Sequence, residues 1–303
     1  MRILCFGSLN IDRVYRLGHL VLPGETISAR SMTIYPGGKG LNQSVALAKA
    51  GSDVYHAGIV GDDGDMLLDT LTAAGVDVSL VKQVENPPSG HAVIQVSDVG
   101  ENSIIVHRGA NFAVDEQYID YVLAGFGSGD ILLVQNEISC LNYIIRQAHD
   151  IGMRVAFNPS PFDDSILSYP LECVDCFIVN EVELSQICGY NAGADDMIAA
   201  LAKKYPNAGV MATLGNRGAV YVDGDGRTVH GVYDVDIVDT TGAGDTFTGY
   251  FLDGLARGFD INDNLRRASM AAAIAVSRPG AAQSIPCRRE VETAELDYIP
   301  PEF

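Results

Sequence analysis

Apolar runs and segments of helical period alternate along most of this chain, most regularly after residue 110. Apolar residues three and four positions apart predict helices over 115–124, 141–149, 181–187 and 265–276. Short runs of β-branched and aliphatic residues predict strands over 2–6, 54–60, 131–134, 155–157, 177–179 and 209–213. Strand–helix alternation of this kind predicts a mostly parallel sheet with helices on both faces.

The first part of the chain contains two further helices. A glycine-rich turn opens the first, which directs Val45 and Leu47 toward the core and ends at Gly51. The second follows the acidic run 62–65. We interpret this run as helix capping, because the rest of the twelve-residue calcium-loop pattern is missing.

Two β-leaning regions do not fit the strand–helix alternation. Residues 91–96 and 103–106 read as a hairpin joined by a turn at 98–101, and residues 13–35 are short, β-leaning and poor in helical signal. Together these regions predict a small separate sheet that could cover the functional site.

Composition bounds the class of protein. The chain has 303 residues, 47% hydrophobic and 19% charged, which suits a large core in one α/β domain or two. No run of 18 apolar residues predicts a membrane span, and residues 1–6 enter a strand without a signal-peptide pattern. We therefore expect a cytoplasmic protein with reduced thiols, in which Cys173 and Cys176 pack as core residues.

The net charge of the chain limits which ligands and partners are expected. The net charge of −19, without a dense Lys/Arg run, makes nucleic acid a poor ligand. No membrane partner is expected either. An anionic nucleotide would need local help from a lysine, an arginine, helix N-termini or a metal ion.

One glycine-rich stretch carries candidate chemistry. The β-branched run 235–238 predicts a strand, Gly242 and Gly244 a tight turn, and the apolar pattern beyond them a helix. Backbone N–H groups at such a helix start can hold a phosphoryl group, and Asp245 beside them can serve as a base. The alternative is an ordinary capped helix start, with Asp245 as a favourable charge.

Other polar residues follow the predicted strands. Asn10 and Asp12 come just after the first strand, and Lys39 and Asn42 offer hydrogen-bond donors beside two adjacent glycines. The alternative for this second stretch is a flexible turn with a solvated lysine. Polar clusters also follow later strands, at 135–137, 158–161, 180–183 and 213–218. Since the carboxyl ends of parallel strands share one edge of the sheet, these clusters are expected to converge there.

Two of these stretches resemble the signatures of a known family. Gly37-Gly38-Lys39-Gly40-Leu41-Asn42-Gln43 and Asp239-Thr240-Thr241-Gly242-Ala243-Gly244-Asp245-Thr246-Phe247 are similar to the motifs of ribokinase (PfkB-type) carbohydrate kinases. The resemblance covers essentially the whole chain. It implies a ribokinase-like three-layer α/β/α fold with a mostly parallel central sheet. It also implies a single domain over 1–303, with a discontinuous β-lid from about 13–35 and 91–107.

The resemblance implies a role for each matching position. Asp245 would be the general base, with Gly242, Ala243 and Gly244 as the anion hole. The sugar would be bound by Asn10, Asp12, Gly38, Lys39, Asn42, Glu137 and Asp245. The nucleotide would lie at Thr213, Gly215, Asn216 and Gly218, with Asn180 and Glu183 ordering the water shell of Mg²⁺. A structural K⁺ ion would lie at Asp239, Thr241, Ala275, Arg278, Gly280 and Ser284.

The implied activity is ATP-dependent phosphorylation of the 5-hydroxyl of D-ribose. The lysine in the first motif is more typical of ribokinases than of fructokinases. Alternatives are a kinase of the same family acting on a nucleoside, fructose or a keto-deoxy sugar acid, or a non-catalytic sugar-binding regulator. Ser269 departs from the family pattern near the adenine and leaves the nucleotide preference open. Lids of such kinases often pair, so a homodimer through the lid is also implied.

Overall fold

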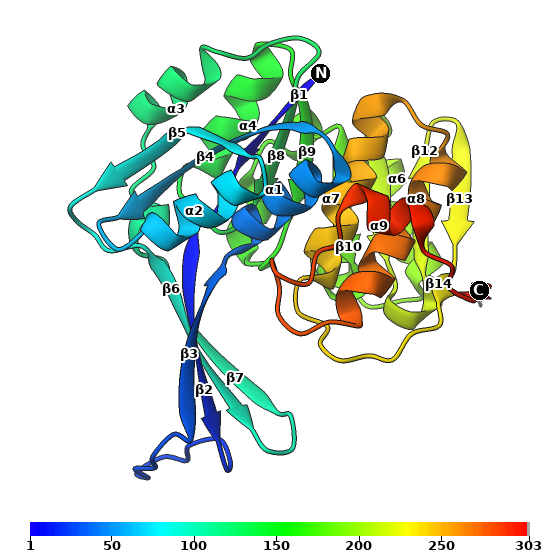
Figure 1. Ribbon diagram of the computed structural model, residues 1–303. Coiled ribbons are helices and arrows are strands. Elements are labelled where there is room, and N and C mark those ends of the chain that lie inside the picture. The colour runs from blue at the N-terminus through cyan, green and yellow to red at the C-terminus, as the bar shows by residue number, and fades with distance from the viewer. Residues whose placement is uncertain (302–303) are drawn as a thin grey trace.

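The computed structural model describes residues 1–301, and its centre is a nine-stranded sheet in the order β13-β12-β11-β10-β9-β8-β1-β4-β5 (Figure 1). Its strands are β1 (Arg2–Phe6), β4 (Asp53–Gly61), β5 (Asp77–Val84), β8 (Ile131–Gln135), β9 (Arg154–Asn158), β10 (Cys176–Asn180), β11 (Gly209–Thr213), β12 (Ala219–Asp223) and β13 (Gly226–His230). All neighbours pair in parallel from β5 to β11, whereas β12 and β13 are antiparallel. The predicted mostly parallel sheet is confirmed.

Helices cover both faces of this sheet. One core cluster involves α3 (Glu116–Leu123), α4 (Leu141–Asp150), α5 (Glu181–Cys188) and α6 (Ala194–Lys204). The other involves α1 (Lys39–Ala50), α2 (Asp65–Ala73), α7 (Ala243–Arg257), α8 (Ile261–Val276) and α9 (Arg288–Thr293). Short 3-10 helices are η1 (Gly109–Phe112), η2 (Asp164–Ser168), η3 (Leu171–Cys173) and η4 (Gly215–Arg217). The arrangement is the three-layer fold expected from the sequence, because central parallel strands must be buried on both sides.

A small four-stranded sheet projects from this body (Figure 1). Its order is β3 (Ser31–Gly37), β2 (Asn10–Leu17), β6 (Gly90–Ser97) and β7 (Asn102–His107). The β6–β7 hairpin is confirmed, and β2 joins the two pairs because it lies antiparallel to β3 and parallel to β6. Asn10 and Asp12 therefore lie in the first strand of the small sheet, where it leaves the body.

The strand predicted over 235–238 is wrong. That segment has no strand pairing, and the side chains of Ile237 and Val238 are 70% and 60% exposed. The backbone N–H groups of Val238 and Asp239 donate instead to the carbonyl of Val276, at the end of α8. The β-branched composition suits an extended segment, but a strand also needs a neighbour to pair with. The nearby pair β14 (Val232–Tyr233) and β15 (Tyr298–Ile299) was not predicted.

The capping role assigned to the acidic run 62–65 is also wrong. Gly64 is the N-cap of α2, and no side chain caps that helix. Asp63 instead accepts a hydrogen bond from the backbone N–H of Ser89 at 2.9 Å, while the Ser89 hydroxyl accepts from the N–H of Gly61. The acidic run thus connects the end of β4 to the segment that enters β6.

The cysteines are unpaired thiols. Cys173 and Cys176 belong to core clusters on opposite faces of the central sheet, which confirms that they pack as core residues. Over residues 1–301, no helix combines the length and apolar character needed to cross a bilayer.

Candidate active site

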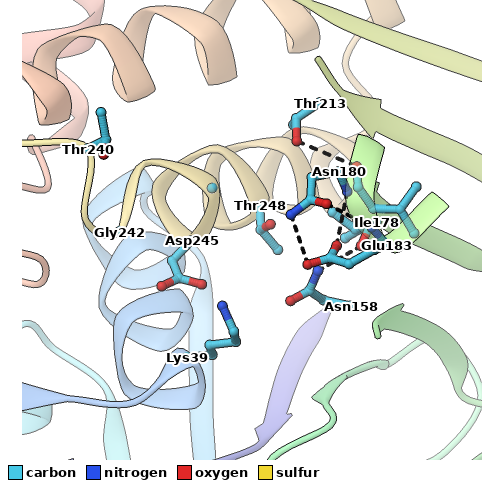
Figure 2. Close-up of a pocket in the computed structure, with 12 residues that line it drawn as sticks. Lys39, Asn158, Ile178, Asn180, Glu183, Thr213, Thr240, Gly242, Asp245 and Thr248 are labelled. Atoms are coloured by element: carbon cyan, nitrogen blue, oxygen red, sulfur yellow. Dashed lines mark hydrogen bonds between the residues drawn. The ribbon is translucent and has the colours of Figure 1, made fainter. Parts of the chain in front are cut away.

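The start of α7 lies beside a cavity of about 240 Å³. The cavity is lined by Lys39, Asn158, Ile178, Val179, Asn180, Glu183, Thr213, Thr240, Gly242, Gly244, Asp245 and Thr248. Figure 2 shows Asp245 and Lys39 reaching into this space from two helices, with Asn180 and Glu183 on the opposite side. The predicted convergence of distant polar clusters is therefore observed. The residues with a predicted role that line this cavity are Lys39, Asn180, Glu183, Thr213, Gly242, Gly244 and Asp245.

Gly242 and Gly244, the two glycines at this helix start, differ in their backbone geometry and surroundings. Gly242 is the N-cap of α7 and has a φ of 75°, a left-handed conformation that favours glycine. A Cβ at Gly244 would meet no heavy atom within 4 Å, so the backbone there borders open space. Ala243 between them donates its N–H to the carbonyl of Thr240 at 3.3 Å. The predicted anion hole therefore has one N–H already engaged within the turn.

Asp245 is only 8% exposed and is held by two neutral amides. Asn42 donates from Nδ2 to Oδ2 at 3.0 Å, and Gln43 donates from Nε2 to Oδ1 at 2.8 Å. Because neither donor is a cation, the carboxylate is oriented without an ion pair in these contacts. Both donors come from the first turn and a half of α1.

A second group of polar residues lies next to this cavity, where β2 leaves the body. Glu137 accepts hydrogen bonds from the Ser8 hydroxyl and from the backbone N–H of Lys39 at 3.0 Å. Burial, helped by the charge of Glu137, raises the pKa of Asp12 to about 7. Burial also raises the pKa of Glu137, although Lys39 opposes the shift. Asn10 is tied to Asn111, whose Nδ2 donates to its side-chain oxygen at 2.7 Å.

Lys39 is the only cation among the residues of the described chain that line the cavity. Burial alone would lower the pKa of Lys39, but the carboxylates of Asp245, Glu137 and Glu183 outweigh burial and raise it. A charged ammonium therefore faces the carboxylates of this site and can meet an anionic ligand.

Asn180 and Glu183 form a capping box at the start of α5. The Asn180 side chain accepts from the Glu183 N–H, and the Glu183 carboxylate accepts from both nitrogens of Asn180, each at 2.9 Å. A carboxylate has about four acceptor positions, so these bonds leave room for water hydrogens. This all-oxygen pair suits the hydration shell of a hard cation such as Mg²⁺.

The two segments predicted to hold K⁺ meet around Asp239. Its carboxylate accepts from the Thr241 N–H at 2.9 Å, the Thr241 hydroxyl at 2.7 Å and the Gly280 N–H at 3.0 Å. Partial burial opposes the shift, but these hydrogen bonds lower the pKa of Asp239. The Arg278 side chain is turned to Glu290 at 2.7 Å, and the Ala275 carbonyl accepts the Arg278 N–H. The Ser284 hydroxyl bonds the carbonyl of Ala281.

The loop after β11 carries the predicted nucleotide positions. Thr213 lines the cavity, whereas Gly215, Asn216 and Gly218 lie in or beside η4 and do not. Gly218 has a φ of 93°, and a Cβ there would collide with the carbonyl of His230. The turn therefore requires glycine for the backbone itself.

Several residues of the site were not predicted. Gln43 stands inside the first motif and Asn158 inside a polar cluster after a strand, but neither was given a role. Thr248 follows Asp245 by three residues and so faces the same side of α7, a spacing that could have identified it. Asn111 shows no signal in the sequence.

Comparisons with known proteins agree with this geometry. The model of the pfkB family carbohydrate kinases matches residues 1–288. The ribokinase of Haemophilus influenzae is 33% identical over 296 residues, covering 94% of this chain and 95% of that protein. The deoxyribokinase of Salmonella typhimurium is 31% identical over 294 residues, covering 94% and 96%.

A solved structure shows the same architecture. The structure of Arabidopsis thaliana ribokinase complexed with ribose and ATP superposes with a TM-score of 0.86 at 31% identity, covering 96% of this chain and 97% of that one. The family match, the sequence relatives and the shared fold extend over nearly the whole length. The chain therefore belongs to the pfkB family of carbohydrate kinases and is a sugar kinase.

Proposed function

We propose that this protein transfers the γ-phosphate of ATP to the 5-hydroxyl of D-ribose. The observation that supports it most is the placement of Asp245, held by two neutral amides beside the glycine turn and facing the Lys39 ammonium across one cavity. The similar proteins include ribokinases, and one of them was solved with ribose and ATP.

In this proposal Asp245 is the general base. It takes the proton of the sugar hydroxyl as that oxygen bonds to the γ-phosphorus, and the bond from phosphorus to the bridging oxygen breaks to release ADP. Backbone N–H groups at the start of α7 and the Lys39 ammonium stabilise the charge on the transferring group. Positioning and charge stabilisation supply most of the rate in such transfers.

The sugar would be held on the side of the cavity nearest the small sheet. Asp12 and Glu137 can accept hydrogen bonds from adjacent hydroxyls. Within residues 1–301 the Oδ1 atom of Asn42 is buried without a hydrogen-bond partner, so it is available to a sugar hydroxyl. Gly38, with a φ of 93°, lets the backbone lie close to the ligand.

Two ions complete the proposal. Asn180 and Glu183 would hold the water shell of Mg²⁺, which neutralises phosphate charge when bound. Oxygen atoms around Asp239, Thr241 and the 275–284 segment would hold K⁺ and so fix the shape of the glycine turn. Both donor sets contain oxygen and no sulfur or imidazole, as hard cations prefer.

The small sheet would pair with that of a second subunit. Its strand β7 is exposed along its whole length, including the side chains of Ile104, Ile105 and Val106. An exposed apolar edge of this kind is usually covered in the functional assembly.

A coupled ADP-release assay tests the substrate. Ribose, 2-deoxyribose, fructose, a nucleoside and a keto-deoxy sugar acid would be compared by kcat/KM, each with and without K⁺. We expect ribose to be preferred and K⁺ to raise its turnover. A higher kcat/KM for any other acceptor would replace ribose as the substrate, and turnover unaffected by K⁺ would remove the cation from the proposal.

A further inference from the structure

We propose that Gln135 and Gln43 form a relay of side-chain amides that sets the orientation of the Asp245 carboxylate. Both act as positioning residues, since they reach the reacting atoms only through Asp245. The proposal rests on the function proposed above, in which Asp245 is the base, and adds how its geometry is set from the core.

The relay runs from the end of β8 through α1 to the start of α7. Gln135 donates from Nε2 to Oε1 of Gln43 at 2.7 Å, and Gln43 donates from Nε2 to Oδ1 of Asp245 at 2.8 Å. A branch from β9 meets it, where Oδ1 of Asn158 faces Nε2 of Gln43 at 3.4 Å. Three parts of the chain that are far apart in sequence are thus joined by one chain of amides.

The orientation of each side-chain amide, oxygen against NH₂ group, follows from a backbone carbonyl and a carboxylate, which can only accept hydrogen bonds. The carbonyl of Ile178 accepts from Nδ2 of Asn158 at 2.7 Å, so the oxygen of Asn158 must face Gln43. Gln43 therefore turns its NH₂ group toward Asn158 and toward the carboxylate of Asp245, which is also an acceptor. Its oxygen is left for the NH₂ group of Gln135. A flip of Gln43 would oppose oxygen to oxygen at two contacts.

Packing holds the relay in place. Gln43 is 1% exposed and Gln135 is fully buried, so neither amide can rotate toward water. The oxygen of Gln135 lies against the backbone of Gly7, directly after β1, where a Cβ would collide with it. Buried amides are unfavourable unless they are hydrogen-bonded. Within residues 1–301 the oxygen of Gln135 has no hydrogen-bond partner, so the bond from its NH₂ group to Gln43 is the main polar contact that holds this amide.

The bond from Gln43 to Oδ1, together with that from Asn42 to Oδ2, fixes the plane of the carboxylate. In general, a hydrogen bond donated to a carboxylate favours the ionised form of that group. The titratable groups that interact with Asp245 across the site are Lys39, Glu137 and the thiol of Cys5. None of them changes when Gln43 is replaced, so a comparison of variants isolates the amide.

The first test is Gln43→Met, which keeps the unbranched shape but removes the donor. We expect kcat to fall by about 10- to 100-fold with the sugar KM changed less than about threefold. The acidic limb of the kcat–pH profile should move to higher pH by about one unit, because a bond that favours the ionised base is lost.

The matched control is Ser44→Ala. Ser44 is the next residue of α1, is equally buried and bonds His56 at 2.7 Å, away from Asp245. It should lower stability and leave kcat and its pH profile unchanged. An unchanged pH profile in Gln43→Met, whatever its loss of activity, would mean that Gln43 only fills space, and the relay would be rejected.

A double-mutant cycle tests the outer member. Gln135→Met alone should lower kcat by about three- to tenfold, and should cause no further loss in the Gln43→Met background if it acts only through Gln43. Independent effects that multiply would overturn the relay.

The proposed function can fail separately from the relay. An inactive wild-type chain, or an Asp245→Asn variant with normal turnover, would reject Asp245 as the base. Wild-type activity that is lost in Asp245→Asn but kept in both glutamine variants would reject only the relay.

Discussion

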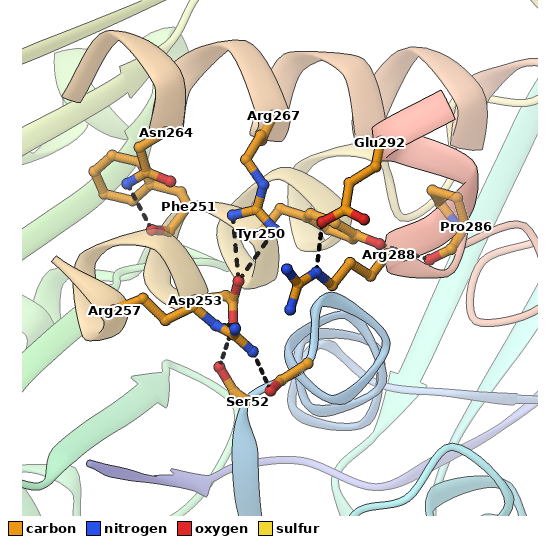
Figure 3. Close-up of polar contacts among 11 residues, drawn as sticks. Ser52, Tyr250, Phe251, Asp253, Arg257, Asn264, Arg267, Pro286, Arg288 and Glu292 are labelled. Carbon is orange, nitrogen blue, oxygen red and sulfur yellow. Dashed lines mark hydrogen bonds and ion pairs between the residues drawn. The ribbon is translucent and has the colours of Figure 1, made fainter. Parts of the chain in front are cut away.

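The two ends of α7 each bury an aspartate, and they hold it in opposite ways. Asp245, in the first turn, is bonded by the amides of Asn42 and Gln43. Asp253, two turns on and fully buried, is bonded by Arg257 at 2.8 Å and by Arg267 at 3.3 Å. Figure 3 shows this second cluster, which also receives the Ser52 hydroxyl at 2.8 Å.

The difference sets a structural carboxylate, Asp253, against the proposed base, Asp245. Two guanidinium groups compensate the charge of Asp253, and Arg267 also stacks over the ring of Phe259 with its carbon 4.6 Å from the centroid. The bond between Asp253 and Arg267 fixes α7 against α8. Neutral amides give Asp245 an equally defined orientation with no ion pair in these contacts. The partner type therefore distinguishes the two roles within one helix.

The largest effect should come from removing the carboxylate of Asp245, the proposed base. Asp245→Asn keeps the shape and should lower kcat by about 10³-fold or more, with the melting temperature nearly unchanged and sugar binding still measurable. Turnover and calorimetric binding of the sugar would be measured on the same preparation. Near-normal turnover would remove the distinction between the two ends.

The matching change at the other end should act on stability. Asp253→Asn leaves the buried guanidinium of Arg267, and that of the more exposed Arg257, with reduced compensation. It should lower the free energy of unfolding by about 3–5 kcal/mol. Thermal unfolding monitored by circular dichroism would show the loss, while kcat of the folded fraction should stay within about twofold. A large drop in kcat at full folding would show that Asp253 also serves the chemistry.

A change in the middle of α7, at Gly249, should affect both stability and kcat. A Cβ at Gly249 would collide with Cβ of Ala46 and lie 2.7 Å from the backbone nitrogen of Leu47. Gly249→Ala should therefore push α7 away from α1 and destabilise the protein by about 1–3 kcal/mol. Because the same shift moves Asp245 away from Gln43, kcat should fall as well, unlike in Asp253→Asn. Ala256→Gly, on the same helix but away from this contact, serves as the control, since it lowers helix propensity and removes one partly buried methyl group without moving α7 from α1.

A third carboxylate, Asp12, differs from both, because neither an arginine nor an amide contributes to the shift of its pKa. Its pKa of about 7 lies above the ordinary 3.8, so the free protein binds this proton more tightly than the unfolded chain. The stabilisation from this group is full below about pH 4 and is lost as pH rises through 7. Sugar hydroxyls that donate to Asp12 favour its ionised form, so sugar binding near pH 7 should release a fraction of a proton.

Titration calorimetry in two buffers of different ionisation enthalpy would measure this release. Asp12→Asn should abolish most of this proton release, which is the smallest effect expected among the four changes. Equal binding enthalpies in both buffers for the wild-type chain would show that sugar binding does not change the protonation of Asp12, and would contradict this prediction.

Local pattern predicted the fold where strands are buried on both faces. The runs 131–134, 155–157 and 177–179 are apolar on every position, and each is a central parallel strand. Prediction failed at the margins. β5 is half exposed and was missed, and 235–238 has strand-like composition without a pairing partner. A strand at an edge depends on neighbours that the local sequence does not reveal.

The site residues likewise fall into those that local sequence predicts and those that depend on long-range packing. Short motifs identified Asp245 and its glycines, because a turn and a helix start are local structures. The chain of amides that leads to Asp245 could not be identified in this way. Gln135 is 92 residues from Gln43, and their contact depends on the packing of α1 over the end of β8. The pKa of Asp12 likewise depends on Glu137, which a distant strand brings near.

The hydrogen bond between Gln43 and Asp245 also has a consequence for how the chain is made. The two residues are 202 positions apart, so at about 5–20 residues per second a ribosome adds the second roughly 10–40 s after the first. During that interval the face of α1 that carries Gln43 and Ala46 has no α7 to cover it. Nascent chains that end before residue 243 should therefore bind chaperones and resist folding. Completion of the core and completion of the active site coincide in the docking of one late helix.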